Sequence, residues 1–485
     1  MIIDWLNGII FLIDALSFFL EKGKMKLIGL LKKLWIFLAL IWIMGAVLII
    51  LKATSYIVTG SVNLFLSAGI VSGIYGNTSG NKMIFTDKSF ITKEQAQSYL
   101  NVSSSFISEM LGKDRNDAVK SVMFLKTHKT AGSTLQNLFF RYAALRDLKV
   151  ALPVYSTSFV YPVVKFHRDL VLQTHTFSYA CCDFLLHHLV LDIEEVRAVT
   201  DSAFHVTILR DPVDLFISAY RYYFFDRCMD GADLVSVDLS RYSHLNVSTC
   251  PQIRMQIANI QSFDLGFILK HALINICYFE KFLQKVDSFF DVVLITELFD
   301  ESLIVLKHML KWNLDDVAYL KHNIQYQRSD KYLLSADQIQ MIDEFNHVDR
   351  LLYEHFKQKL LTSIKALKRS GVAFNEEVIA LRARNQQILE ACIEGVVLSS
   401  QVKKDPQRYM FAGYGFTNAY QLKKEALNNT LCRAMALPEV SFDEYFKGMF
   451  PDKENRPKTK RELQDMIKAA LYKVDITIPA PCSLL

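Results

Sequence analysis

The chain has 485 residues, of which 51% are hydrophobic, and a formal net charge of +5. This length suffices for one large domain with appendages or for two domains. Residues 1–33 contribute five lysines against two aspartates and one glutamate. The remaining chain is nearly balanced, so it lacks the strong positive field that would predict a nucleic-acid partner.

An uncharged run at residues 34–51, LWIFLALIWIMGAVLIIL, predicts a transmembrane helix. At about 1.5 Å per residue it spans roughly 27 Å, close to the thickness of a bilayer core. The lysines precede it, which predicts a cytoplasmic N-terminus and a luminal remainder. The long basic leader disfavours a cleaved signal peptide. Residues 53–81 are also uncharged but rich in small polar residues, and they are interpreted as a stem or, alternatively, as a second span.

Sequons and cysteines support a luminal position. N-x-S/T sequences predict glycosylation at Asn77, Asn101, Asn246 and Asn428. All eight cysteines follow residue 180, and their even number suits an oxidising compartment. Cys228 and Cys250 are close enough in sequence to close a loop, whereas the adjacent Cys181 and Cys182 are expected to pair elsewhere if they pair at all. Cys277 is equally well interpreted as a buried thiol.

Short β-rich runs alternate with helical stretches beyond about residue 118. Strands are expected at 121–126, 170–174, 204–209 and 291–296, and helices at about 133–147, 183–198, 212–227 and 300–311. This alternation predicts an α/β fold with a mostly parallel sheet flanked by helices, in which ligands bind at the carboxyl ends of strands. The later chain is helical: a capping box begins at Ser335, and another helix follows Asn375. Residues 451–462 are a polar segment before a last short helix.

The stretch FLKTHKTAGSTLQNLFF, residues 124–140, has the pattern of a strand, a loop and a helix. Such a turn points backbone N–H groups and the helix dipole at an anion. Lys129 adds a positive charge, and Thr130, Ser133 and Thr134 add hydroxyl groups. The lysine precedes Gly132 instead of following it, which disfavours a Walker-type nucleoside triphosphatase. An ordinary βα turn is the other interpretation of this stretch.

A second strand ends in the same way within HVTILRDPVDLFISAYRYY, residues 205–223. Arg210 at the strand end can hold a phosphate with two hydrogen bonds, and Ser218 lies two turns into the following helix. Two phosphate sites at two strand ends predict a nucleotide phosphorylated at two positions. No His, Asp and Glu residues occur at metal-ligand spacing, so no metal is expected.

Together the two stretches resemble the sulfotransferases that use 3′-phosphoadenosine 5′-phosphosulfate, and most closely the galactose 3-O-sulfotransferase family of the galactosylceramide type. The similarity covers about residues 120–360 and includes, in order, THKT, NLFFRY, HHLVLDIEEVRAV, FHVTILRDPV, residues 291–323 and FNHVDRLLYEHF. One departure is Ala131-Gly132, where the resemblance would place Gly and Ser. This difference could shift the loop backbone by one residue.

The resemblance implies a P-loop-like sulfotransferase fold and a role for each matching residue. Lys129 would contact the phosphosulfate and neutralise the departing phosphate. The loop residues Thr130, Ala131, Gly132, Ser133 and Thr134 would hold the 5′-phosphate, and Arg210 with Ser218 would hold the 3′-phosphate. His188 would be the general base that deprotonates the sugar hydroxyl, with His187 in reserve and His128 as a weaker candidate. Without the resemblance, His187 and His188 would be interpreted as ordinary surface or core histidines.

The implied protein is a single-pass type II Golgi membrane enzyme. It would move a sulfuryl group from 3′-phosphoadenosine 5′-phosphosulfate to the 3-hydroxyl of galactose on a glycolipid or glycoprotein, without a metal. The expected organisation is a cytoplasmic tail (1–33), a signal anchor (34–51), a stem (52–117), a catalytic domain (118–360) and a helical C-terminal extension (361–485).

Three alternatives stay open. One is a uronyl or heparan 2-O-type sulfotransferase, which would share the loop and the histidine. Another is a P-loop-like kinase, which the missing Walker lysine and the lack of an obvious Mg²⁺-binding aspartate disfavour. The third is an inactive, membrane-anchored relative that binds a nucleotide or a glycan.

Overall fold

The computed structural model describes residues 117–449, except 154–156, 163, 173–180, 201, 229–257, 268–275, 325–333 and 399–416. The predicted tail, anchor and stem up to residue 116 lie outside the described residues. The same is true of Asn77, Asn101, Asn246 and the segment after residue 449. Within the described residues, no helix combines the length and the apolar character needed to cross a membrane.

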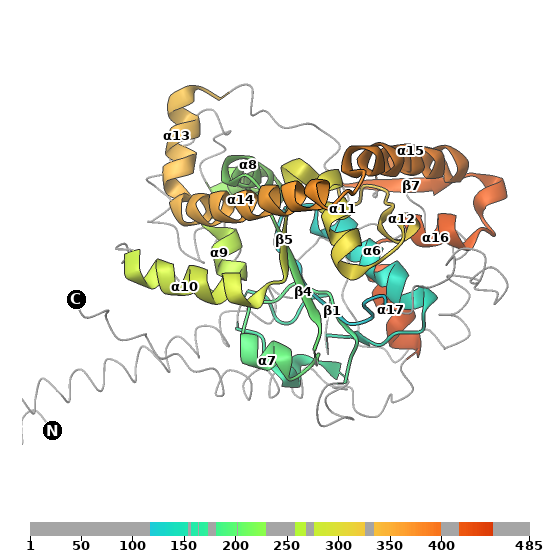
Figure 1. Cartoon of the computed structure of the whole chain (residues 1–485), viewed down its shortest axis with the longest axis horizontal. Helices are drawn as coiled ribbons and strands as arrows, with labels where there is room; N and C mark the ends of the chain where they lie inside the picture. Colours follow the sequence, from blue (N-terminus) through green and yellow to red (C-terminus); the bar gives the residue numbers. More distant parts are fainter. Residues whose placement is uncertain are drawn as a thin grey trace, which may run out of the picture. The chain divides into compact units, whose positions relative to one another are not determined.

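A five-stranded parallel sheet forms the centre of the described fold (Figure 1). Its order is β2-β3-β1-β4-β5, and every neighbouring pair is parallel. The strands are β1 (Val122–Leu125), β2 (Val150–Ala151), β3 (Phe184–Leu185), β4 (Phe204–Leu209) and β5 (Val292–Ile295). Strands β1 and β5 are buried along their whole length, as expected for parallel strands covered by helices on both faces. The predicted α/β class with a mostly parallel sheet is confirmed.

Two predicted elements are wrong. Residues 170–172 of the predicted strand 170–174 form no strand: a 3₁₀ turn η1 (Arg168–Leu170) precedes Val171, which makes a single bridge to Pro153, and residues 173–174 lie outside the described residues. The missing strand is β3, which lies inside the predicted helix 183–198. Only α7 (Ile193–Arg197) is helical there, because the Asp192 side chain caps it by accepting a hydrogen bond from the Glu195 N–H.

Helices follow the other strands as predicted. Helix α6 (Gly132–Leu145) follows β1, α8 (Pro212–Tyr222) follows β4, and α11 (Phe299–Leu310) follows β5. The Ser335 capping box begins α13 (Ala336–Phe345), and the chain turns at Asn346 into α14 (His347–Arg369). The remaining elements are α9 (Ile260–Asp264), α10 (Ile276–Phe289), α12 (Leu314–Val317), α15 (Phe374–Cys392), α16 (Thr430–Ala436), α17 (Glu439–Met449), η3 (Phe225–Cys228), η6 (Thr296–Leu298) and η9 (Lys424–Ala426).

Helices cover both faces of the sheet. Helices α11 and α14 pack on β5, while α16 and α17 pack on α6 (Figure 1). The contact with α6 is aromatic at its centre, where Phe140 stacks on Phe442 with ring centroids 5.2 Å apart. Helices α16 and α17 therefore contribute residues to the same hydrophobic core as the strands.

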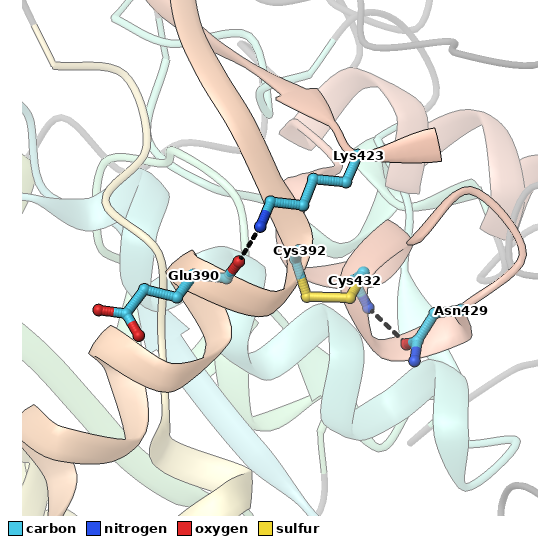
Figure 2. The surroundings of a disulfide bond; sticks show 5 residues. All are labelled: Glu390, Cys392, Lys423, Asn429 and Cys432. Atoms are coloured by element: carbon cyan, nitrogen blue, oxygen red, sulfur yellow. Dashed lines mark hydrogen bonds between the residues drawn. A yellow bond between two sulfur atoms is a disulfide. The ribbon is translucent and has the colours of Figure 1, made fainter. Parts of the chain in front are cut away.

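A disulfide holds this C-terminal part together. Cys392, at the end of α15, is bonded to Cys432 in α16, and the antiparallel pair β6 (Ile393–Leu398) and β7 (Asn418–Leu422) lies between them in sequence (Figure 2). The two cysteines are separated by 40 residues. A cross-link of this span contributes about 2–4 kcal/mol, mainly by restricting the unfolded chain.

The other described cysteines differ in state. Cys228 is disulfide-bonded, and its partner lies outside the described residues, so pairing with Cys250 stays a prediction. Cys181 and Cys182 are buried free thiols with their Sγ atoms 2.6 Å apart. They therefore do not pair with cysteines elsewhere in the chain. Cys277 has no described side chain.

Candidate active site

The carboxyl ends of β1, β3, β4 and β5 meet at one edge of the sheet, and a cavity of about 540 Å³ opens there. Most of the predicted site residues line it: Lys129, Ala131, Gly132, Ser133, Thr134, His188, Arg210 and Ser218. Thr130 and His187 are the two predicted residues that do not. The structure therefore brings together motifs that are up to 90 residues apart in the sequence.

Hydrogen bonds from neighbouring strands fix the loop after β1. The Thr127 hydroxyl donates to the Ile208 carbonyl at 2.5 Å, and the Thr296 hydroxyl donates to the Thr130 carbonyl at 2.9 Å. Thr130 itself is fully buried, with its hydroxyl 2.8 Å from that of Thr127. Thr130 therefore supports the loop from behind instead of facing the cavity.

The start of α6 provides backbone donors. The N–H groups of Thr134 and Leu135 donate to the Ala131 carbonyl, which closes the first turn. Gly132 and Ser133 precede these residues and line the cavity, so their N–H groups have no partner within the helix. Two adjacent N–H groups at a helix N-terminus suit the oxygens of a phosphate.

The Ala131-Gly132 pair has a specific steric explanation. Ala131 takes the left-handed conformation, with φ at 65°, whereas Gly132 does not. A Cβ atom on Gly132 would lie 3.0 Å from Cγ of Lys126 and 3.2 Å from the Thr127 carbonyl oxygen. Gly132 is therefore needed because the Lys126 side chain passes against it, and not for its backbone angle.

Positive groups converge on the cavity. Arg210 donates from Nη1 to the Lys129 carbonyl at 3.0 Å, while Gln261 holds its backbone N–H and carbonyl. The Nε atom of Arg210 is buried and has no partner among the described residues. The ammonium of Lys129 lies 3.2 Å from the ring centroid of Tyr222. Burial, followed by the charges of Arg210 and Lys126, holds the pKa of Lys129 well below its usual value.

These cations fit a polyanionic ligand. A buried guanidinium nitrogen without a partner is costly, and so is a buried ammonium that has no counterion. Elsewhere in the cavity lining, the carboxylates of Asp300 and Glu301 are already paired with Arg382, at 2.6 and 3.1 Å. An anion bound near Lys129 and Arg210 would supply the missing partner.

His188 is held as a neutral base. Its Nδ1 atom lies 2.7 Å from the Lys126 carbonyl oxygen, which can only accept, so Nδ1 carries the proton. The lone pair of Nε2 is then available to take a proton. Burial, followed by the neighbouring His128 and Lys126, holds the pKa of His188 well below its usual value. His188 is therefore unprotonated at neutral pH.

His128 also reaches the cavity. Its ring stacks on that of His188 with centroids 3.8 Å apart. The fully buried carboxylate of Asp264 accepts the His128 backbone N–H at 2.8 Å and lies 3.0 Å from the ring Nδ1. A carboxylate in this position orients an imidazole for proton transfer, so His128 stays a second candidate for the base.

His187 occupies a different environment. It is fully buried, its Nε2 atom lies 2.6 Å from Asp443 of α17, and its ring packs edge-on against Phe140 and Phe159. This position gives no support to the prediction that His187 is a reserve base. Its contacts are those of a core histidine with a buried carboxylate partner.

Several cavity residues were not predicted. Arg221 and Tyr222 lie one turn beyond Ser218 on α8, so helical spacing could have identified them. The segment 319–324 forms another wall; most of it falls within the resembling stretch 291–323, which did not by itself indicate a place in the site. It is held by the Thr134 hydroxyl, which accepts the His322 N–H at 3.0 Å, and by Tyr420 of β7, which donates to the Lys321 carbonyl at 2.7 Å. In the part of the chain that the structure describes, no three His, Cys, Asp or Glu side chains are placed to hold a metal ion.

Comparison with known proteins gives one consistent family. A family model described as galactose-3-O-sulfotransferase matches residues 46–449. The galactosylceramide sulfotransferase of Bos taurus is 32% identical over 67% of this chain and 77% of its own length. Galactose-3-O-sulfotransferase 2 of Mus musculus is 31% identical over 69% of this chain and 86% of its own length. Galactose-3-O-sulfotransferase 3 of Homo sapiens is 30% identical over 67% of this chain and 77% of its own length.

Replacing Ala131 by glycine is expected to raise the free energy of unfolding by about 0.5–1 kcal/mol. Glycine removes the left-handed penalty of about 1–2 kcal/mol, and its greater freedom in the unfolded chain offsets part of this gain. Chemical denaturation measures the difference. Gly132→Ala is the matched control and should be destabilising, because its Cβ meets Lys126 and Thr127. Equal or lower stability of Ala131→Gly would contradict the backbone assignment.

Proposed function

The chain belongs to the galactose-3-O-sulfotransferase family and is a galactose sulfotransferase, and we propose that it sulfates the 3-hydroxyl of galactose on a glycolipid or glycoprotein glycan with 3′-phosphoadenosine 5′-phosphosulfate as donor. The observation that carries this proposal is the position of Lys129, Arg210 and His188 around one cavity. Transfer of a sulfuryl group from an anionic donor to a hydroxyl requires cationic groups to bind the donor and a neutral base to take the hydroxyl proton.

The donor is proposed from the two anion-binding corners of the cavity. The N–H groups of Gly132 and Ser133, with Lys129, would hold the 5′-phosphosulfate. Arg210 and Ser218, on the next strand and helix, would hold the 3′-phosphate. The unpartnered Nε of Arg210 supports this division, since a phosphate oxygen would give it an acceptor.

The chemistry follows from these positions. His188 would accept the proton of the galactose hydroxyl at Nε2 while the hydroxyl oxygen forms its bond to sulfur. The bond from sulfur to the bridging phosphate oxygen breaks in the same displacement, and Lys129 would neutralise the charge that this oxygen gains. Such in-line transfer depends mainly on positioning and on charge neutralisation.

The alternatives are less well supported. Family membership favours galactose over a uronic acid as the acceptor sugar. The inactive alternative was raised by the Ala131-Gly132 departure. Gly132 and Ser133 nevertheless line the cavity at the start of α6, and the Nδ1–H bond of His188 leaves the lone pair of Nε2 available. Transfer of labelled sulfate to a panel of galactosides and uronic-acid glycans tests the proposal, and incorporation into neither group would overturn it.

The proposed location is the Golgi membrane, with one span at residues 34–51 and a luminal catalytic part. The lysines before the span support this orientation. The Cys392–Cys432 disulfide suits an oxidising lumen, and Asn428 is exposed just before α16.

Arg210→Ala is expected to weaken binding of adenosine 3′,5′-bisphosphate by about tenfold or more. A charge-assisted hydrogen bond contributes about 1.5–3 kcal/mol, and 1.4 kcal/mol is a factor of ten. Binding of adenosine 5′-phosphate should change much less, which titration of both nucleotides measures. Arg210→Lys is the control that keeps the charge without the paired donors. Equal affinity of the unaltered protein for the two nucleotides would remove the case for a 3′-phosphate site.

His188→Ala is expected to lower turnover by about 10²–10⁴ while leaving nucleotide affinity nearly intact. In the unaltered enzyme, activity should fall only when His188 becomes protonated. Because its pKa is lowered, the acidic limb of kcat/KM should lie below the ordinary histidine value of about 6.5. His128→Ala is the comparison: if it removes this limb and His188→Ala does not, His128 is the base.

Glycosidase treatment of the expressed protein should increase its mobility on a gel, because a luminal domain exposes its sequons to the glycosylation machinery. Asn428→Gln should remove one part of that shift. Absence of any shift, together with a C-terminus that protease reaches in intact microsomes, would mean that residues 53–81 cross the membrane a second time.

A further inference from the structure

Helix α17 reaches the loop after β1 through an ion pair in which Lys126 is buried and Glu439 is partly exposed. Its first residue, Glu439, has Oε2 at 2.5 Å from the ammonium of Lys126. Gln136 of α6 completes the group: it accepts from Lys126 at 2.8 Å and donates to the other Glu439 oxygen at 2.9 Å. Only 3% of the Lys126 side chain is exposed, so solvent screens this pair weakly.

Lys126 connects this ion pair to the general base. Its side chain passes against Gly132 toward α17, while its carbonyl oxygen holds the Nδ1–H of His188 at 2.7 Å. The residue that fixes the tautomer of His188 is thus itself held by Glu439. A change in the position of Lys126 would move the acceptor that orients the imidazole.

The same helix makes a second contact beside the base. Asp443 lies one turn after Glu439 and pairs with His187 at 2.6 Å, and His187 is the neighbour of His188 in sequence. Helix α17 is itself fixed to α6, because Asn137 donates to the carbonyls of Ala434 and Leu437, just before the helix, at 3.0 and 2.8 Å. Helix α17 therefore contacts both Lys126, whose carbonyl oxygen orients the base, and His187, which precedes the base in the chain.

We propose that α17 is the positioning element of the general base, with Glu439 acting through Lys126 and Asp443 acting through His187. This assigns a catalytic support role to a segment more than 300 residues away from the loop in sequence. The proposal rests on the proposed function, in which His188 is the base. Glu439 and Asp443 are positioning residues, since neither lines the cavity.

The charge of Glu439 allows a positioning role to be distinguished by experiment from a purely structural contact. Glu439 compensates the positive charge of Lys126, which lies close to His188 and to the anion-binding loop. Without that carboxylate, the field of Lys126 would disfavour protonation of His188 further and would attract an anionic nucleotide more strongly. Loss of positioning should therefore lower turnover while nucleotide binding becomes tighter or stays the same.

Glu439→Gln tests this directly in the full-length protein. We expect kcat to fall by about 10- to 100-fold, the loss typical of a misplaced catalytic group. Affinity for adenosine 3′,5′-bisphosphate should rise or stay equal, and the acidic limb of the pH profile should move to lower pH. Glu439→Asp keeps the charge and should restore the position of that limb. Glu376→Gln, an exposed acid in the first turn of α15, is the matched control and should change none of these.

Asp443→Asn is the second variant and decides the matter if Glu439→Gln does not fold. It leaves Lys126 paired, so kcat should fall without a change in nucleotide affinity or in the acidic limb. Unchanged kcat in both variants, or a parallel loss of kcat and nucleotide affinity, would overturn the proposal. Absence of sulfate transfer to any galactoside by the unaltered enzyme would instead overturn the proposed function.

Discussion

Parallel pairing of β1 with β3 and β4 is the constraint on which the site depends. In parallel strands the carboxyl ends meet at one edge, so the residues that follow each strand lie at that same edge. The loop with Lys129 follows β1, His188 follows β3, and Arg210 follows β4. An antiparallel neighbour would carry its following residues to the opposite edge, and the cation and base would be separated by the length of the sheet.

The charged groups at this edge differ in whether the protein itself supplies a partner for them. Lys126 is neutralised by Glu439, Asp264 is paired with His128, and the Nε atom of Arg210 lacks a partner among the described residues. Lys126 and His128 both line the cavity but have carboxylate partners within the protein, whereas the Nε atom of Arg210 is left without one. Buried ion pairs contribute little to stability. The ion pairs at this edge are therefore better explained by the way they orient the groups around the cavity.

Sequence patterns predicted the parts of the fold that depend on neighbouring residues. The loop after β1, the helix cap at Ser335 and the turn at Arg210 each have a short signal, because caps and turns are built from adjacent residues. Strand β3 was missed since two buried residues in a continuous apolar run show no alternation. The pairing of Glu439 with Lys126, and of Asp443 with His187, was missed because nothing local marks contacts across more than 250 residues.

The disulfide between Cys392 and Cys432 bears on where a fragment that contains the described fold can end. Helices α16 and α17 pack on α6 and are joined to α15 through that bond (Figure 2). A fragment that stops after α14 would keep all five strands and the loop after β1. It would nevertheless leave Phe140 and Asn137 uncovered on α6 and the ammonium of Lys126 without its carboxylate. A fragment that keeps these contacts with α17 complete therefore extends to Met449, and it has to be produced where cysteines can oxidise.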